Sequence, residues 1–264
     1  QPVFITSIRD DSVGGDSNND GNVSSPAPGD WGEMDIASGG SATFDHTIIR
    51  YGGGSGSSSH NLGLSDTAQA TLRNSTVSHS KMYGIYLAFN LTGQVNRLTV
   101  ENGIIANNLV DGIYAGSTNG RHEVSVSGTK IQTNGRDGAN LAEVDLQLTG
   151  NTFTNNAGRA AYITSGSLKA IGNNSGSGNG TGAIALAGSF TGDTTLPGNP
   201  GGFPYAFNMW VESGSTWTLG AGAIVKNLPG ASPSIRGMLV SQGTAAQPVF
   251  ITSIRDDSVG GDSN

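Results

Sequence analysis

The chain has no cysteine in 264 residues, and both charged and aromatic side chains are scarce, at 12% and 6%. Without cysteine there are no disulfides and no thiolate metal sites, so stability must come from the core, from hydrogen-bond ladders and from bound ions. Lysine and arginine number only 13, and the formal net charge is −7. This balance disfavours a nucleic-acid partner, because phosphate binding needs clustered basic side chains. No apolar run is long enough to span a membrane.

Glycine, serine, threonine and asparagine are abundant, with 42 glycines alone. They interrupt every apolar run after a few residues, so the long windows of 3.6-residue periodicity that a helix needs never accumulate. The composition predicts an all-β chain of short strands joined by tight turns. Low charge and the absence of cysteine are also compatible with a secreted protein, and we expect an extracellular, cell-surface location.

One segment occurs twice: residues 1–18 recur without a change as residues 247–264, at an offset of 246. Either an end was duplicated by engineering, or the chain is one period of a longer tandem array. We favour the array, because the chain opens inside a strand-like run, Pro2 to Ile8, with neither an initiator methionine nor a signal-like sequence. Residues 1–264 would then be a single repeat unit, and the expected partners are further copies of it.

A looser repeat runs through the middle of the chain. Similar short strands begin at five positions spaced 28, 26, 22 and 22 residues apart, namely Gly84, Gly112, Gly138, Ala160 and Gly182. Second strands lie between them, at 70–77, 95–100, 124–131 and 146–153. Periods of 20 to 30 residues without a helical half predict a parallel β-helix, here of roughly ten coils with loop insertions. Asparagine and glycine suit its corners, because they tolerate positive φ.

A turn-dense stretch at 193–206 marks a candidate internal seam. The chain resembles the right-handed parallel β-helix proteins of bacterial cell surfaces, which have a pectate-lyase-like architecture and usually lack the lyase site. The resemblance extends over nearly the whole chain, and the residues that carry it are 14–22, 28–32, 44–52, 220–226 and 243–253. It implies a non-catalytic, right-handed β-helix, while the same architecture serves adhesins, fibres and carbohydrate enzymes.

The strongest candidate site is a run of alternating oxygen-bearing side chains beside a glycine at position 21, formed by Asp16, Asn18, Asp20 and Asn22. This spacing matches the first half of a calcium loop, in which alternate side chains converge on one cation. Position 12 of the loop is Ala27, which disfavours an EF-hand, so that Asp30, Asp10 or Asp11, or backbone carbonyls and water, would complete the site. The alternative is a solvated acidic turn.

Other candidate sites are weaker. Tyrosines at similar positions of successive coils either stack on sugars or pack on one another, and these are Tyr83, Tyr86 and Tyr114. The tryptophans, Trp31, Trp210 and Trp217, are expected to cover coil edges or the seam. Asp111, Arg136 and Asp137 could be assembled into a lyase-like site, but both aspartates precede a glycine at a turn. None of the four histidines shows metal-ligand spacing, and we expect no enzymatic activity.

These observations predict a structural repeat module of an extracellular fibre, stalk, sheath or giant adhesin. A β-solenoid exposes unpaired strand edges only at its ends, and a chain whose end repeats its beginning removes those edges by continuing. The alternative is a surface β-helix that binds or cleaves polysaccharide, and it requires a groove lined by aromatic rings and carboxylates.

Overall fold

The computed structural model describes residues 1–264 except 22, 55, 57–58, 89–91 and 117–119. Apart from the short 3-10 helix η1 (Pro200–Gly202), the regular elements in these residues are strands. No helix among them is long and apolar enough to cross a membrane. The strands are β1 (Val3–Ile5), β2 (Met34–Ile36), β3 (Ser41–Asp45), β4 (Thr47–Arg50), β5 (His60–Leu64), β6 (Gln69–Arg73), β7 (Thr76–Ser78), β8 (Tyr83–Leu87), β9 (Val95–Glu101), β10 (Ile104–Ala106), β11 (Ile113–Ala115), β12 (Arg121–Ser127), β13 (Lys130–Gln132), β14 (Ala139–Thr149), β15 (Thr152–Thr154), β16 (Arg159–Gly172), β17 (Ser175–Ser177), β18 (Thr181–Phe190), β19 (Thr194–Leu196), β20 (Tyr205–Val211), β21 (Thr216–Leu219), β22 (Ile224–Asn227), β23 (Ser234–Ile235), β24 (Met238–Ser241) and β25 (Phe250–Ser253).

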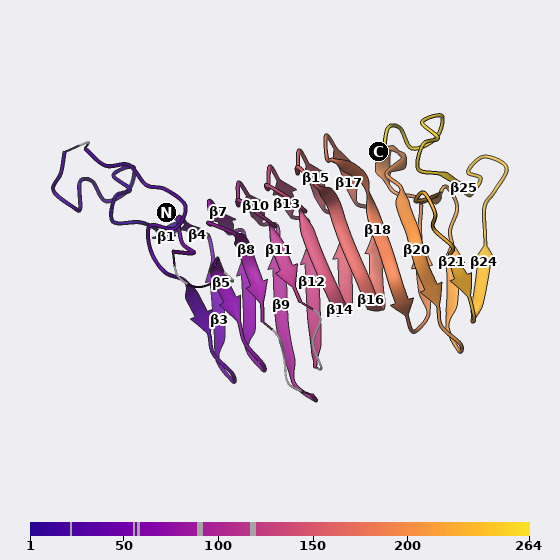
Figure 1. The fold of residues 1–264 in the computed structure, drawn as a ribbon, viewed down its shortest axis with the longest axis horizontal. Helices are drawn as coiled ribbons and strands as arrows, with labels where there is room; N and C mark the ends of the chain where they lie inside the picture. Colours follow the sequence, from indigo (N-terminus) through magenta and orange to yellow (C-terminus); the bar gives the residue numbers. More distant parts are fainter. Residues whose placement is uncertain (22, 55, 57–58, 89–91, 117–119) are drawn as a thin grey trace.

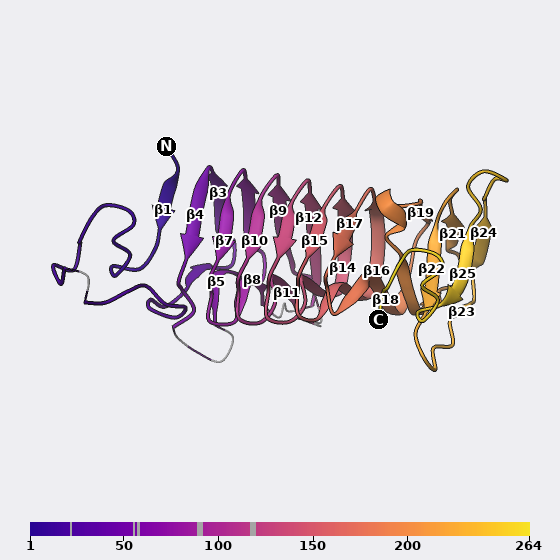
Figure 2. The same cartoon turned by 90° about the horizontal axis from the view of Figure 1, so that it is seen from above.

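Each strand pairs in parallel with the equivalent strand one coil away, so the chain forms an elongated stack (Figure 1). One sheet of seven strands has the order β1-β4-β7-β10-β13-β15-β17 and forms a single row (Figure 2). The longest path has ten strands, β2-β5-β8-β11-β14-β16-β18-β20-β22-β25. The prediction of an all-β parallel β-helix is confirmed.

Residues with positive φ turn the chain from the sheet of β6, β9 and β12 into the seven-stranded sheet. They occupy one equivalent position in successive coils, and their φ values all lie between 50° and 67°. These residues are Asn74, Asn102, Gly128, Gly150 and Asn173. The prediction that 70–77, 124–131 and 146–153 are each one strand was therefore wrong. Each is split by its asparagine or glycine, because that residue adopts the left-handed conformation.

The opposite corner is built differently, because long strands bend through it without ending. β14 pairs with β11 through residues 139–141 and with β12 through residues 144–149. Glu143, which lies between these two stretches, has a φ of 54°. One strand therefore contributes to two faces of the solenoid.

Inward side chains of all the coils form one continuous apolar core. Buried asparagines extend it as two hydrogen-bonded ladders. Asn108, Asn134 and Asn156 form one ladder, in which each side-chain amide donates to the next Oδ1 at 2.9 Å. Such buried amides are stable because each finds an acceptor one coil away.

The cross-section changes near the predicted seam. The seven-stranded sheet ends at β17, and a sheet of order β19-β21-β24 begins at Thr194, while β18 and β20 remain paired across the seam. Trp217, which was predicted to cover a coil edge or the seam, lies in the core near the seam and is fully buried between Phe190 and Phe207. Trp210, in contrast, is 43% exposed.

Candidate functional site

The polar loop after β1 brings three carboxylates together. One oxygen each from Asp11, Asp16 and Asp20 lies within 4.8 Å of the others. Asp16 closes the turn, because its two carboxylate oxygens accept hydrogen bonds from the backbone N–H groups of Asp20 at 3.0 Å and Gly21 at 2.8 Å. Asn18 joins the group by donating to Asp20 Oδ2 at 2.8 Å. The sequence-predicted residues 16, 18 and 20 therefore do converge.

The same loop contains three buried oxygens without a hydrogen-bond partner: Asp11 Oδ1, Asn18 Oδ1 and Asp20 Oδ1. The pKa of Asp11 is raised by desolvation and by the negative charge of Asp16 and Asp20. Unpartnered oxygens of this kind are ligands that Ca²⁺ accepts. The chemistry of the donor set thus fits a hard cation.

Asp30, a further predicted ligand, has partners outside the cluster. Asp30 accepts hydrogen bonds from Ser7 Oγ at 2.7 Å and Arg9 Nη1 at 3.1 Å, so it is not one of the three clustered carboxylates. Asn22 lies outside the described residues.

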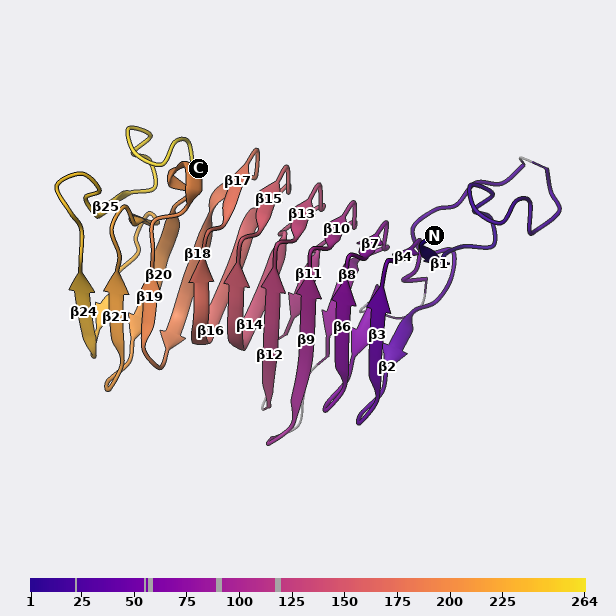
Figure 3. The ribbon, with the colours of Figure 1, turned by 180° about the vertical axis from the view of Figure 1, so that it is seen from behind.

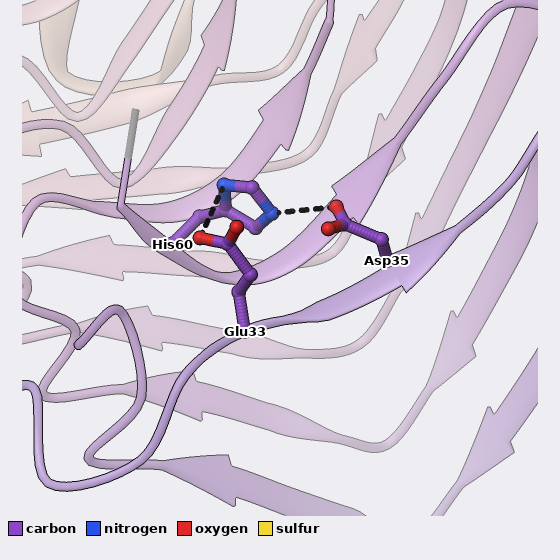
Figure 4. Close-up of side chains that lie close together, drawn as sticks. All are labelled: Glu33, Asp35 and His60. Carbon is purple, nitrogen blue, oxygen red and sulfur yellow. Dashed lines mark hydrogen bonds and ion pairs between the residues drawn. The ribbon is translucent and has the colours of Figure 1, made fainter. Parts of the chain in front are cut away.

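A second cluster joins Glu33, Asp35 and His60 (Figure 4). His60 Nε2 lies 2.9 Å from Asp35 Oδ1, and its Nδ1 lies 4.0 Å from Glu33 Oε2. Gly63 makes this contact sterically feasible, because a Cβ there would lie 2.2 Å from both Asp35 Oδ1 and His60 Nε2. The histidine spacing did not reveal the cluster, since Asp35 and His60 are 25 residues apart and meet only because that separation is one coil.

His60 begins a stack of aromatic rings on the outer face of β5, β8 and β11. Its ring lies 5.2 Å from that of Tyr86, and the Tyr83 and Tyr114 rings are 4.6 Å apart. Tyr86 and Tyr114 are nearly parallel, at an interplanar angle of 2°. The faces of these rings therefore contact one another, as the prediction that the tyrosines pack on one another requires.

The aspartates considered for catalysis are buried and paired with arginine. Arg136 Nε donates to Asp111 Oδ1 at 2.7 Å, and Arg159 Nε lies 3.3 Å from Asp137 Oδ1. Burial raises the pKa of Asp111, against the opposing effect of Arg136. Each pair links one coil to the next and holds the turn before its glycine.

The outer face carries two adjacent hollows that share Lys169, one of about 310 Å³ over β9, β12, β14 and β16 and one of about 550 Å³ over β16, β19 and β21. Figure 3 shows the strands of this face. Their lining is polar and aliphatic, with threonine, glutamine, acidic and basic side chains. No aromatic ring among the described residues lines either hollow.

The turn near the end of the duplicated segment is similar in both of its positions. Ser17 Oγ donates to Gly15 O at 3.3 Å, and Ser263 Oγ donates to Gly261 O at the same distance. The paired glycines have φ values of 75° and 74° in the first copy and 69° and 68° in the second. Local sequence therefore favours this turn in both positions.

The two copies pair through opposite edges of the same strand. In the first copy, Val3 N–H donates to His46 O, beside β4 of the following coil. In the second copy, Phe250 N–H donates to Ala223 O, beside β22 of the preceding coil. Phe250 is the equivalent of Phe4, and successive backbone N–H groups of a strand point to opposite sides. The two sets of hydrogen bonds therefore use different groups.

The model of the family described as "Right handed beta helix region" matches residues 35–199, more than half of the chain. The chain belongs to this family. Membership confirms the predicted handedness, and the matched part of this right-handed β-helix ends where the seven-stranded sheet gives way to the β19-β21-β24 sheet. Comparison with curated proteins and with solved structures found no match.

Proposed function

We propose that this right-handed β-helix is a structural repeat module of an extracellular fibre, stalk, sheath or giant adhesin. The observation that carries the proposal is the pairing of one 18-residue sequence with the preceding coil in one position and with the following coil in the other. In a tandem array a single copy of the segment would make both sets of contacts. The stack would then pass from repeat to repeat without an open sheet edge.

Both ends of the stack expose the apolar side chains that such continuation would cover. Val3 and Phe4 are 58% and 36% exposed, and Phe250 and Ile251 are 38% and 57% exposed. Ile5 is in register with buried Ile49, and Ile251 is in register with buried Val225. The segment thus presents apolar side chains to its neighbours at both ends.

Electron microscopy of native material tests the fibre proposal. We expect filaments whose axial repeat is about 50 Å, from roughly ten strand spacings of ~4.8 Å. Isolated globular particles, or an axial repeat far from this value, would contradict it.

The alternative, polysaccharide binding or cleavage at the surface, has less support. Tyr83, Tyr86 and Tyr114 stack on one another, and Asp111 and Asp137 are held by arginines. The polar hollows around Lys169 are the part of the outer face where a polysaccharide would bind. Mixing with acidic polysaccharide would then lower viscosity or create unsaturated ends, and the fibre proposal predicts neither.

We also propose that the loop of Asp11, Asp16, Asn18 and Asp20 binds Ca²⁺, with the unpartnered oxygens as ligands. A bound cation would offset the repulsion among these carboxylates. Removal of Ca²⁺ by a chelator should therefore lower the melting temperature.

The double substitution Asp16→Ala with Asp20→Ala should abolish the effect of the chelator. Asp66→Ala, in a turn away from the loop, is the control and should retain it. Equal melting temperatures of the unsubstituted chain with and without chelator would refute the calcium site.

A further inference from the structure

We propose that the flank of the solenoid formed by Ala183, Ala185, Ala206 and Lys226 is a docking site for residues 1–18 of a second copy of this chain. In the structure, residues 247–264 of the same chain occupy this site. The inference rests on the proposed tandem association and names its contact surface and partner. Residues 8–18, and their equivalents 254–264, are called the arm below.

An isoleucine anchors the arm. Ile254 is 3% exposed and packs against the three alanines, with Tyr162 and Leu228 beside them. Its equivalent in the first copy, Ile8, is 66% exposed. Small side chains at positions 183, 185 and 206 leave space for this one large side chain. The first arm therefore presents in solvent the residue that the site buries, and burial of such a side chain favours docking.

A lysine recognises the turn that follows. Lys226 is fully buried, and its Nζ donates to Gly261 O at 2.6 Å and to Ser263 Oγ at 3.0 Å. The equivalents of these acceptors are Gly15 O and Ser17 Oγ, which have the same mutual geometry in the first arm. Burial lowers the pKa of Lys226, and Asp257, Asp256 and Asp262 oppose this effect. The ammonium group is thus matched to an acidic turn.

The two copies of the segment bury complementary sets of side chains. In the first copy, Ser7 and Asp10 are buried against Asp30 and Arg50, which belong to the following coils. In the second copy, Ile254 and Ser263 are buried against the preceding coils. The sets do not overlap, so one segment can satisfy both neighbours at once.

The arm is also directed correctly for such docking. In Figures 1 and 2 the loop after β1 extends beyond the N-terminal end of the stack, and the C-terminal segment folds back in the same direction along the solenoid. A repeat placed before β1 would therefore receive the first arm on its flank, as its own β22 receives β25.

The absence of cysteine from the sequence permits a disulfide test with the full chain. In the docking variant, Ile8→Cys with Ala206→Cys, a bond between the two thiols joins the arm of one chain to the site of another. Ile254→Cys with Ala206→Cys should instead give an intramolecular disulfide, because these side chains pack together in one chain. The control variant is Ile8→Cys with Leu109→Cys, at an exposed residue outside the site.

The chain's own arm covers Ala206, so the docking and control variants are compared with Ile254→Asp added to both, which weakens that arm at the site. Under mild oxidation we then expect roughly tenfold more disulfide-linked dimers and higher multimers from the docking variant than from the control variant, because docking raises the effective concentration of the thiols. Without Ile254→Asp the excess should be smaller. Circular dichroism verifies that each variant retains its strands.

A yield no higher than that of the control variant, both with and without Ile254→Asp, would overturn the docking site. That result would leave the covalent array intact if native filaments with a one-repeat period are observed. Cross-linked multimers from a protein whose native material lacks filaments would instead retain the docking site and refute the fibre.

Discussion

His122 lies inside the solenoid, with both ring nitrogens near oxygen atoms. Its Nδ1 is 2.5 Å from Asn96 Oδ1, and its Nε2 is 2.9 Å from Gly116 O. Burial lowers the pKa of His122 below its usual 6.5, against the opposing effects of the Gly116 carbonyl and Glu143. The unfolded chain therefore binds this proton at a higher pH than the folded chain does.

The free energy of unfolding should consequently fall as the pH drops below about 6.5, by at most about 1.4 kcal/mol per pH unit from this one group. The contribution of neutral His122 to stability is complete above about pH 6.5. It decreases as the pH falls from there to the lowered pKa of the folded state, and below that pKa it does not change further. Urea titrations between about pH 5 and 7.5 measure it. His122→Gln should reduce the slope, and His46→Gln, at an exposed side chain, should leave it unchanged. An unaltered slope in His122→Gln would contradict the argument.

Residue-level prediction from the sequence succeeded where neighbours in the chain decide the contact. Asp16, Asn18 and Asp20 lie within five residues and converge as expected. It failed for Glu33, Asp35 and His60, because these side chains meet across one coil and need the space left by Gly63. The register in which particular side chains meet across one coil is a property of the folded stack, and the coil period alone does not reveal it.

Strand β1 and its equivalent in β25 show how one sequence element acquires different contacts. Asp10 has a side chain only 2% exposed and accepts a hydrogen bond from Arg50 Nε at 2.7 Å. Asp256, its equivalent, is half-buried and bonded to Ser258 and Thr252. The surroundings of the element, rather than its sequence, determine how much each carboxylate stabilises the fold.

Asp10→Asn should lower the free energy of unfolding by about 3 kcal/mol, because it leaves the Arg50 charge partly buried without its counter-charge. The identical substitution at position 256 should cost far less. Chemical denaturation of the two variants makes the comparison, and equal losses would show that the two copies are not in different environments.

Corner residues explain why strand boundaries were predicted less well than strand identity. The segment 124–131 has the alternation of a single strand, but Gly128 with a φ of 59° divides it between two sheets. At the opposite corner Glu143 also has positive φ, yet β14 continues on both sides of it. Whether a turn ends a strand depends on the coil stacked beside it, and this information is tertiary.

On the scale of the whole molecule, the duplicated strand changes sheets between its two positions. β1 pairs with β4 in the seven-stranded sheet, whereas β25 pairs with β22 on the longest path of the other sheet. If one segment makes both contacts in an array, the seven-stranded sheet of one repeat continues the longest path of the repeat before it. Consecutive repeats must then be rotated about the fibre axis.

Helical reconstruction of filaments should therefore give a rotation per repeat equal to the angle between these two faces, together with the axial rise of about 50 Å. A rise of this size without rotation would show that the joint forms by another pairing. The measurement separates a twisted fibre from a straight one built of the same modules.

The all-β class, the solenoid period, the asparagine and glycine corners and the repeated segment follow from the sequence alone, because they depend on residue type and short-range spacing. Three features depend on tertiary packing: the repeated strand uses opposite edges in its two positions, Ile254 is buried while Ile8 is exposed, and Glu33, Asp35 and His60 meet. Two identical sequences carry identical local preferences, so the coils packed against them are the sole source of these differences.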